Sequence, residues 1–201
     1  MKKLYKDYGE QLINEILENK TKSLPGGLPH LLYGSRISTA SLFIKIGRNF
    51  EKWFRFIAED CGMEMLPDGV MKNVINGKSK DIDLLFINKE TKTIHYRELK
   101  SNIELDTEKL PATYNKIVKI NEYVKKEYPN YEVDSRLLNW SVYNKDVLPK
   151  KYNTKITKCN EAGVRVSWPV DFFNIVGADI SEQDYYDFFR DLGKMTNETN
   201  N

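Results

Sequence analysis

The sequence predicts an α/β fold in the broad sense: an α+β arrangement in which helices flank a mixed β-sheet. All of residues 1–201 are expected to form a single domain. Three observations support this prediction. The chain is 40% hydrophobic and 12% aromatic, which is enough to fill one core at a length of 201 residues. Apolar residues recur at helical spacing near both ends of the chain. Between them, two apolar runs joined by a short polar turn are typical of a β-hairpin.

The elements expected before the hairpin are two helices, a loop and a short strand. Residues 2–20 carry apolar side chains on one helical stripe, and so do residues 40–60, which follow a capping serine or threonine. Prolines and glycines interrupt the segment 22–36, which is therefore expected to be a loop. Residues 65–76 are expected to contain a short strand, and the segment 76–80 is the turn that leads into the hairpin.

The hairpin itself consists of residues 80–88, a polar turn at 89–92 and residues 93–100. After it, Pro111 lies near the start of a predicted helix that runs to about residue 127. Residues 137–144 alternate apolar and polar side chains, as a half-buried strand does.

The C-terminal part is predicted to add a second hairpin and a last helix. Residues 151–159 and 164–168 are its two expected strands, joined by a four-residue turn. Ser181 is the expected N-cap of the last helix, and Gly193 is expected to help end it.

Composition and motif content exclude several functional classes. No stretch of about 18 apolar residues exists, so no membrane span is expected, and neither GxxxxGK[ST] nor GxGxxG is present to bind a nucleotide cofactor. Cys61 and Cys159 lack metal-ligand spacing and suit a reducing cytoplasm, while His30 and His95 stand alone. Lysines and arginines outnumber acidic residues by 11 to 5 over residues 109–158, which is compatible with a surface that faces a polyanion.

Asp83, Glu98 and Lys100 are the candidate active-site residues. Side chains two apart on a strand share a face, so Glu98 and Lys100 point the same way, as do Asp81 and Asp83. Folding of the hairpin places an aspartate beside the glutamate and the lysine. Two carboxylates suit Mg²⁺, with the Leu99 carbonyl as a further candidate ligand, and the ammonium suits a phosphodiester. In the alternative interpretation these residues form an exposed ladder of cross-strand charges, but the apolar flanks favour a central hairpin.

The pattern of Asp83, fourteen further residues and then Glu98-Leu99-Lys100 resembles the PD-(D/E)xK signature of a nuclease superfamily. This superfamily includes most type II restriction endonucleases. Ile82 replaces the proline that usually precedes the aspartate, which leaves Asp81 as the alternative to Asp83. We favour Asp83 because it directly precedes the apolar run.

The resemblance implies a restriction-endonuclease-like core of helix, three-strand meander, helix and strand, which residues 39–144 supply in that order. The first helix of such a core often presents an acidic residue to the metal site, and Glu51 is the candidate. The implied activity is Mg²⁺-dependent, sequence-specific hydrolysis of double-stranded DNA that leaves 5′-phosphate ends. Because a palindromic site has two-fold symmetry, a homodimer is expected, with residues 151–195 as a recognition or dimerisation elaboration.

Two other functions stay open: a structure-specific nuclease of DNA repair or junctions, and a DNA-binding module without catalysis. The intact set of Asp83, Glu98 and Lys100 argues against the second. DNA is expected to meet flexible turns, a helix N-terminus and exposed basic side chains. The candidate DNA-contacting residues are Arg36, Lys78, Lys80, Lys109, Thr113, Asn115, Lys116 and Arg165.

Overall fold

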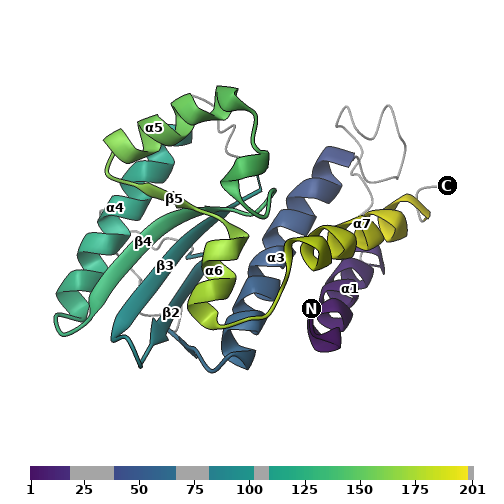
Figure 1. Ribbon diagram of the computed structural model, residues 1–201, viewed down its shortest axis with the longest axis horizontal. Helices are drawn as coiled ribbons and strands as arrows, with labels where there is room; N and C mark the ends of the chain where they lie inside the picture. Colours follow the sequence, from purple (N-terminus) through teal and green to yellow (C-terminus); the bar gives the residue numbers. More distant parts are fainter. Residues whose placement is uncertain (19–38, 67–81, 102–108, 199–201) are drawn as a thin grey trace, which may run out of the picture. The chain divides into compact units, whose positions relative to one another are not determined.

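The chain divides into two units in a computed structural model (Figure 1). We call residues 55–179 the sheet unit, and residues 1–54 together with residues 180–201 the helical unit. The single-domain organisation expected from the sequence stays a prediction. In the part of the chain that the structure describes, no helix is long and apolar enough to cross a membrane. The described residues are 1–18, 39–66, 82–101 and 109–198.

The sheet unit is built on a mixed sheet that has five strands within the described residues. Their spatial order equals their sequence order: β1 (Glu64–Met65), β2 (Leu84–Asn88), β3 (Thr93–Lys100), β4 (Glu132–Asn139) and β5 (Arg165–Ser167). The first three strands form an antiparallel meander, whereas β4 and β5 run parallel to β3. Parallel neighbours need crossover connections, and these contain the helices α4 (Lys109–Glu127) and α5 (Asn153–Glu161). The predicted fold class, a mixed sheet flanked by helices, is confirmed.

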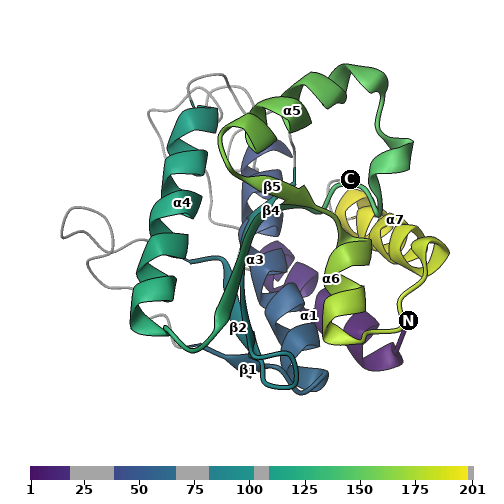
Figure 2. The ribbon, with the colours of Figure 1, turned by 60° about the vertical axis from the view of Figure 1, so that its left-hand side comes forward.

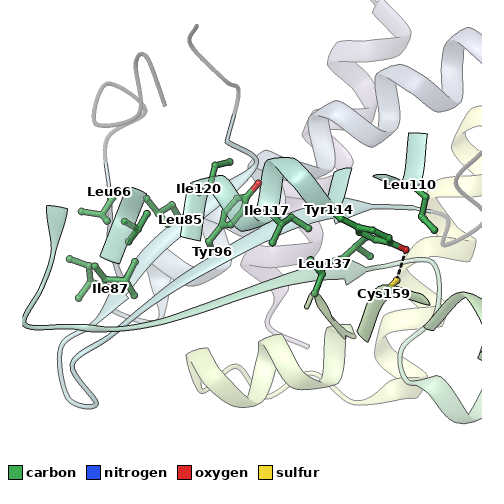
Figure 3. Packing of buried hydrophobic residues seen from close by; sticks show 13 residues of the cluster. Leu66, Leu85, Ile87, Tyr96, Leu110, Tyr114, Ile117, Ile120, Leu137 and Cys159 are labelled. Carbon is green, nitrogen blue, oxygen red and sulfur yellow. Dashed lines mark hydrogen bonds between the residues drawn. The ribbon is translucent and has the colours of Figure 1, made fainter. Parts of the chain in front are cut away.

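The main hydrophobic core of the sheet unit lies between the sheet and α4. Because alternate side chains of a strand share a face, Tyr96 on β3 joins the cluster of buried residues that includes Ile117 and Ile120 of α4 (Figure 3). The same cluster contains a hydrogen bond between the Tyr114 hydroxyl on α4 and the Cys159 thiol on α5, at 3.0 Å. This core fixes α4 over the face of β3 that carries Tyr96.

The opposite face of the sheet is covered by α6 (Pro169–Val176), as Figure 2 shows with α4 on one side of the sheet and α6 on the other. The ring of Phe86 on β2 meets the ring of Phe172 edge-on, with 6.1 Å between the centroids. It also stacks on the His95 imidazole at 5.0 Å. Both faces of the central strands are therefore buried, which explains the nearly continuous apolar run of β2.

The helical unit packs around aromatic side chains. Its helices are α1 (Lys3–Glu18), the N-terminal part of α3 (Thr39–Asp60) and α7 (Glu182–Glu198). The indole of Trp53 is fully buried, stacks on Phe188 with 5.2 Å between the centroids, and donates through Nε1 to the Tyr5 carbonyl at 2.8 Å. Gly9 gives α1 a close approach, because a Cβ at this position would lie 2.2 Å from the Phe188 ring.

Several predicted elements are confirmed. The helices expected over 2–20, 40–60 and 111–127 correspond to α1, α3 and α4, and the hairpin turns at residues 89–92. Ser181 caps α7, because its Oγ accepts the Asp184 N–H at 3.1 Å. β1 at Glu64–Met65 only reaches the start of the range 65–76 in which a strand was expected, and residues 67–76 and the expected turn 76–80 lie outside the described residues.

The predicted second hairpin is wrong. Residues 151–159 are mostly helical, in a short 3-10 turn at Lys150–Tyr152 followed by α5, and they form no strand. β4 and β5 are parallel, so the chain between them must cross over the sheet, and a helix that buries Cys159 makes that crossover. The chain turns from α5 toward β5 at Gly163, whose φ of +76° is a left-handed conformation that favours glycine.

Two further boundaries differ from expectation, and one helix was not expected. The strand predicted at 137–144 is β4 at Glu132–Asn139, because its charged residues at 132–136 obscured the pattern of a strand. Helix α7 continues through Gly193 to Glu198, since an interior glycine weakens a helix by only about 1 kcal/mol. Helix α6 was not expected, although Pro169 occupies the first helical turn, where proline is favoured.

Candidate active site

The pairing of β2 with β3 brings the two predicted carboxylates together. Leu84 pairs with Arg97 in the antiparallel register, so Asp83, just before β2, comes opposite Glu98. The Leu99 N–H donates to Asp83 Oδ2 at 2.8 Å, which holds the aspartate against the end of β3. Both carboxylates are shielded, since 8% of the Asp83 side chain and 4% of the Glu98 side chain are exposed.

Two lysines neutralise this carboxylate pair. Lys100 Nζ lies 2.7 Å from Glu98 Oε1 and 3.7 Å from Asp83 Oδ2. Lys116 Nζ, on the second turn of α4, lies 2.5 Å from Glu98 Oε2 and 3.5 Å from Asp83 Oδ1. We call Asp83, Glu98, Lys100 and Lys116 the carboxylate cluster. The structure thus unites the three residues of the hairpin pattern and adds a lysine that the sequence had suggested as a DNA contact.

Tyr96 supports the cluster from inside the core. Its hydroxyl donates to Glu98 Oε2 at 2.7 Å, and its side chain is fully buried. Burial, followed by the Glu98 charge and hydrogen bond, holds the pKa of the Tyr96 phenol well above its ordinary value, so the hydroxyl is a donor at neutral pH. Tyr96 was not among the predicted site residues, although it lies two residues before Glu98 and therefore on the same face of the strand.

The pKa values of the two carboxyl groups of the cluster are shifted in opposite directions. Burial raises the pKa of Asp83, and the nearby Glu98 charge raises it further, while Lys116 and Lys100 only partly offset this. Burial also favours the neutral form of Glu98, but the charges of Lys116 and Lys100 outweigh it and hold the Glu98 pKa below its ordinary value. Two carboxylates that share one site behave in this way, because the second charge is harder to form beside the first.

The donor set of the site fits a magnesium ion. Mg²⁺ prefers hard oxygen ligands and is commonly held by one or two carboxylates together with water and substrate oxygens. Asp83 and Glu98 supply the carboxylates. The N–H and C=O of a strand residue point to the same side, so the Leu99 carbonyl faces the side on which its N–H meets Asp83. No group of three or more acidic, histidine or cysteine side chains forms a metal cluster within the described residues.

The remaining predicted site residues lie in several places. Glu51 is half-buried on α3 in the helical unit, and its part in catalysis stays a prediction. On α4, Asn115 is exposed and Thr113 is buried. Arg165 on β5 is largely exposed and pairs with Asp134 at 2.7 Å. Arg36, Lys78, Lys80 and the alternative ligand Asp81 lie outside the described residues, as does the side chain of Lys109.

A second buried charge network lies on the other face of β3. The Arg97 guanidinium is fully buried and donates to the Asp134 carboxylate at 2.7 Å and to the Asp134 carbonyl at 2.6 Å. Burial raises the pKa of Asp134, but the His95 hydrogen bond and the Arg97 charge outweigh it and hold this pKa well below its ordinary value. Burial lowers the pKa of Arg97 to about 10, so it stays charged at neutral pH. Since side chains alternate along a strand, this network braces the strands from behind the carboxylate cluster.

Comparison with known proteins places the chain in a family. A family model described as "Type II restriction endonuclease, HinfI" matches residues 41–193, which include both β2 and β3 and all members of the carboxylate cluster. The type II restriction enzyme HinfI of Haemophilus influenzae is 46% identical over 55 residues, which are 27% of this chain and 21% of that enzyme. The aligned segment therefore spans about a fifth of this curated relative. Because the family model covers most of the sequence, the chain belongs to the HinfI family of type II restriction endonucleases.

Proposed function

We propose that this protein is a Mg²⁺-dependent type II restriction endonuclease of the PD-(D/E)xK superfamily. It hydrolyses phosphodiesters of double-stranded DNA at a specific sequence and leaves 5′-phosphate ends. The observation that carries this proposal is the shielded pair of Asp83 and Glu98, with Lys100 2.7 Å from Glu98, at the end of a central hairpin. Membership of the HinfI family supports it.

In this proposal the ligands of the divalent cation are Asp83, Glu98 and the Leu99 carbonyl. A cation held by these groups would supply Lewis-acid chemistry, namely activation of a water molecule and stabilisation of negative charge on the phosphate that is cut. Asp83 is held ready by the Leu99 N–H, and Glu98 by the Tyr96 hydroxyl. These hydrogen bonds keep the oxygens in place before substrate arrives, so little reorganisation is needed during the reaction.

Lys100 is the side chain of the cluster that acts on the reacting groups. Its side chain remains 29% exposed, whereas the carboxylates beside it are nearly covered. An ammonium in that place donates hydrogen bonds to the attacking water and offsets charge on the phosphate. Its Nζ donates to Glu98 Oε1 at 2.7 Å, which holds the ammonium beside the carboxylates.

We further propose a homodimer that binds a two-fold symmetric DNA site, with one carboxylate cluster for each strand. Residues 151–195 serve recognition or dimerisation. Arg165 and Asn115 contribute to DNA contact, in keeping with their exposure on β5 and α4.

Digestion of phage DNA with the purified protein and Mg²⁺ tests the activity, and sequencing of the fragment ends gives the site. Glu98→Gln and Asp83→Asn preserve shape but remove a ligand charge, so cleavage is expected to fall at least a hundredfold. Glu122→Gln, which removes a charge from the exposed side of α4, is the matched control and should cut normally. Discrete fragments support a restriction enzyme. Nicking confined to branched DNA would favour a junction nuclease, and binding without any cleavage would favour an inactive module.

A further inference from the structure

We propose that Lys116 competes with the divalent cation for the oxygens of Asp83 and Glu98. The role assigned to Lys116 rests on the proposed function, because it requires these carboxylates to be the metal ligands. It also extends that function, since the hairpin pattern contains a single lysine, Lys100, and the sequence had suggested Lys116 only as a DNA contact.

The two lysines divide the four carboxylate oxygens between them. Lys100 contacts Glu98 Oε1 at 2.7 Å and Asp83 Oδ2 at 3.7 Å. Lys116 contacts the other oxygen of each group, Glu98 Oε2 at 2.5 Å and Asp83 Oδ1 at 3.5 Å. Each ammonium therefore bridges both carboxylates. A cation that binds both groups must share oxygens that a lysine already holds.

We assign this role to Lys116 because the proposed function keeps Lys100 beside the reacting groups. Lys116 reaches the site from α4, whereas Lys100 is two residues from Glu98 on the same strand face. Its Nζ ends a flexible four-carbon stem, so it can withdraw without any change in the pairing of β2 with β3. The Lys116 side chain is 18% exposed, so it is not sealed into the core.

Competition and a purely structural role predict opposite changes in the affinity for the cation when the Lys116 charge is removed. If Lys116 competes with the cation, removal of its charge frees Glu98 Oε2 and Asp83 Oδ1, and the affinity for the cation rises. If Lys116 only holds the carboxylates in place, its removal lets them move apart and the affinity falls. Measurement of cation binding in the absence of DNA separates the two roles without any use of activity.

The experiment is isothermal titration of the full chain, free of DNA, with Mg²⁺ and with Mn²⁺ as a tighter-binding substitute. Lys116→Met keeps most of the side-chain volume and removes the charge. Its Kd for the cation is expected to be about tenfold lower than that of the wild type, as fits the loss of one close charge from a shielded site. Lys119→Met removes the same charge from an exposed position of α4 and should keep the wild-type Kd.

Each result bears on the inference. Tighter binding by Lys116→Met, and also by Lys116→Gln as a second variant, supports it. Equal or weaker binding in folded variants overturns it, and so does loss of folding in both, because Lys116 would then be a structural residue. If the wild type and all variants bind no cation, the proposed metal site itself is wrong. If the wild type binds and only the tightening is missing, the proposed function stands and the role of Lys116 falls.

Discussion

The hydrogen bond from Tyr96 to Glu98 offers a sharp test of how the core supports the site. The hydroxyl of Tyr96 is buried and lies 2.7 Å from Glu98 Oε2. A hydrogen bond with one charged partner contributes about 1.5–3 kcal/mol. Glu98 keeps its contact with Lys100 through Oε1 at 2.7 Å, so Tyr96→Phe should cost the lower value, about 1.5 kcal/mol.

If that free energy is lost from the transition state, kcat falls about tenfold, since 1.36 kcal/mol corresponds to one factor of ten. The assay is single-turnover cleavage of a plasmid at saturating Mg²⁺, together with urea unfolding of each variant. KM for DNA is expected to change little, because the Tyr96 hydroxyl is buried and contacts Glu98 rather than substrate.

Tyr114→Phe is the matched control for this prediction. Tyr114 belongs to the same hydrophobic cluster, but its hydroxyl bonds to the Cys159 thiol instead of a carboxylate. Its loss should lower the free energy of unfolding by about 0.5–1 kcal/mol and leave kcat unchanged. A wild-type kcat in Tyr96→Phe, or an equal loss of kcat in both variants, would refute the view that Tyr96 acts through Glu98.

Two further predictions concern stability. Gly9→Ala should lower the free energy of unfolding by about 1–2 kcal/mol in urea, because its Cβ would meet the Phe188 ring at 2.2 Å. Gly193→Ala, with no described neighbour within 4 Å, should instead raise it by about 0.5–1 kcal/mol, and equal effects would contradict this packing. The pKa of Asp134 is held below its ordinary value. The stability that this carboxylate contributes is therefore fully present above about pH 4 and is lost as the pH falls further. Asp134→Asn should lower the free energy of unfolding by about 3–5 kcal/mol at pH 7, because it leaves the buried Arg97 without its charged partner. Between pH 7 and pH 3 this variant should lose less stability than the wild type. The same dependence of stability on pH in both proteins would count against this role of Asp134.

The sequence alone predicted the central hairpin and the three residues that meet on it. This was possible because the signals are local: an apolar run, a polar turn at 89–92 and side chains that alternate along a strand. Once the turn sets the register, Asp83 must lie opposite Glu98, and Lys100 must share the face of Glu98. The order of helix, meander, helix and strand follows from similar local patterns.

Local patterns were insufficient where the sheet determined the structure. The segment that contains Ile156 has too few apolar residues to distinguish a strand from a helix, and the parallel pairing of β4 with β5 imposed the helix α5. The start of β4 was missed because Asp134 is charged. That charge is accommodated by Arg97, which comes from a strand 37 residues earlier in the chain.

Lys116 shows the same division between local and tertiary information. Its position on a helix was predictable, but its contact with Glu98 depends on how α4 packs against β3 through the buried side chains around Ile117 and Ile120. Sequence patterning thus determined which residues share a strand face, because that property repeats every two residues. Tertiary packing alone decided that a second lysine would meet the same carboxylates, because that contact joins two elements whose relative placement no local pattern encodes.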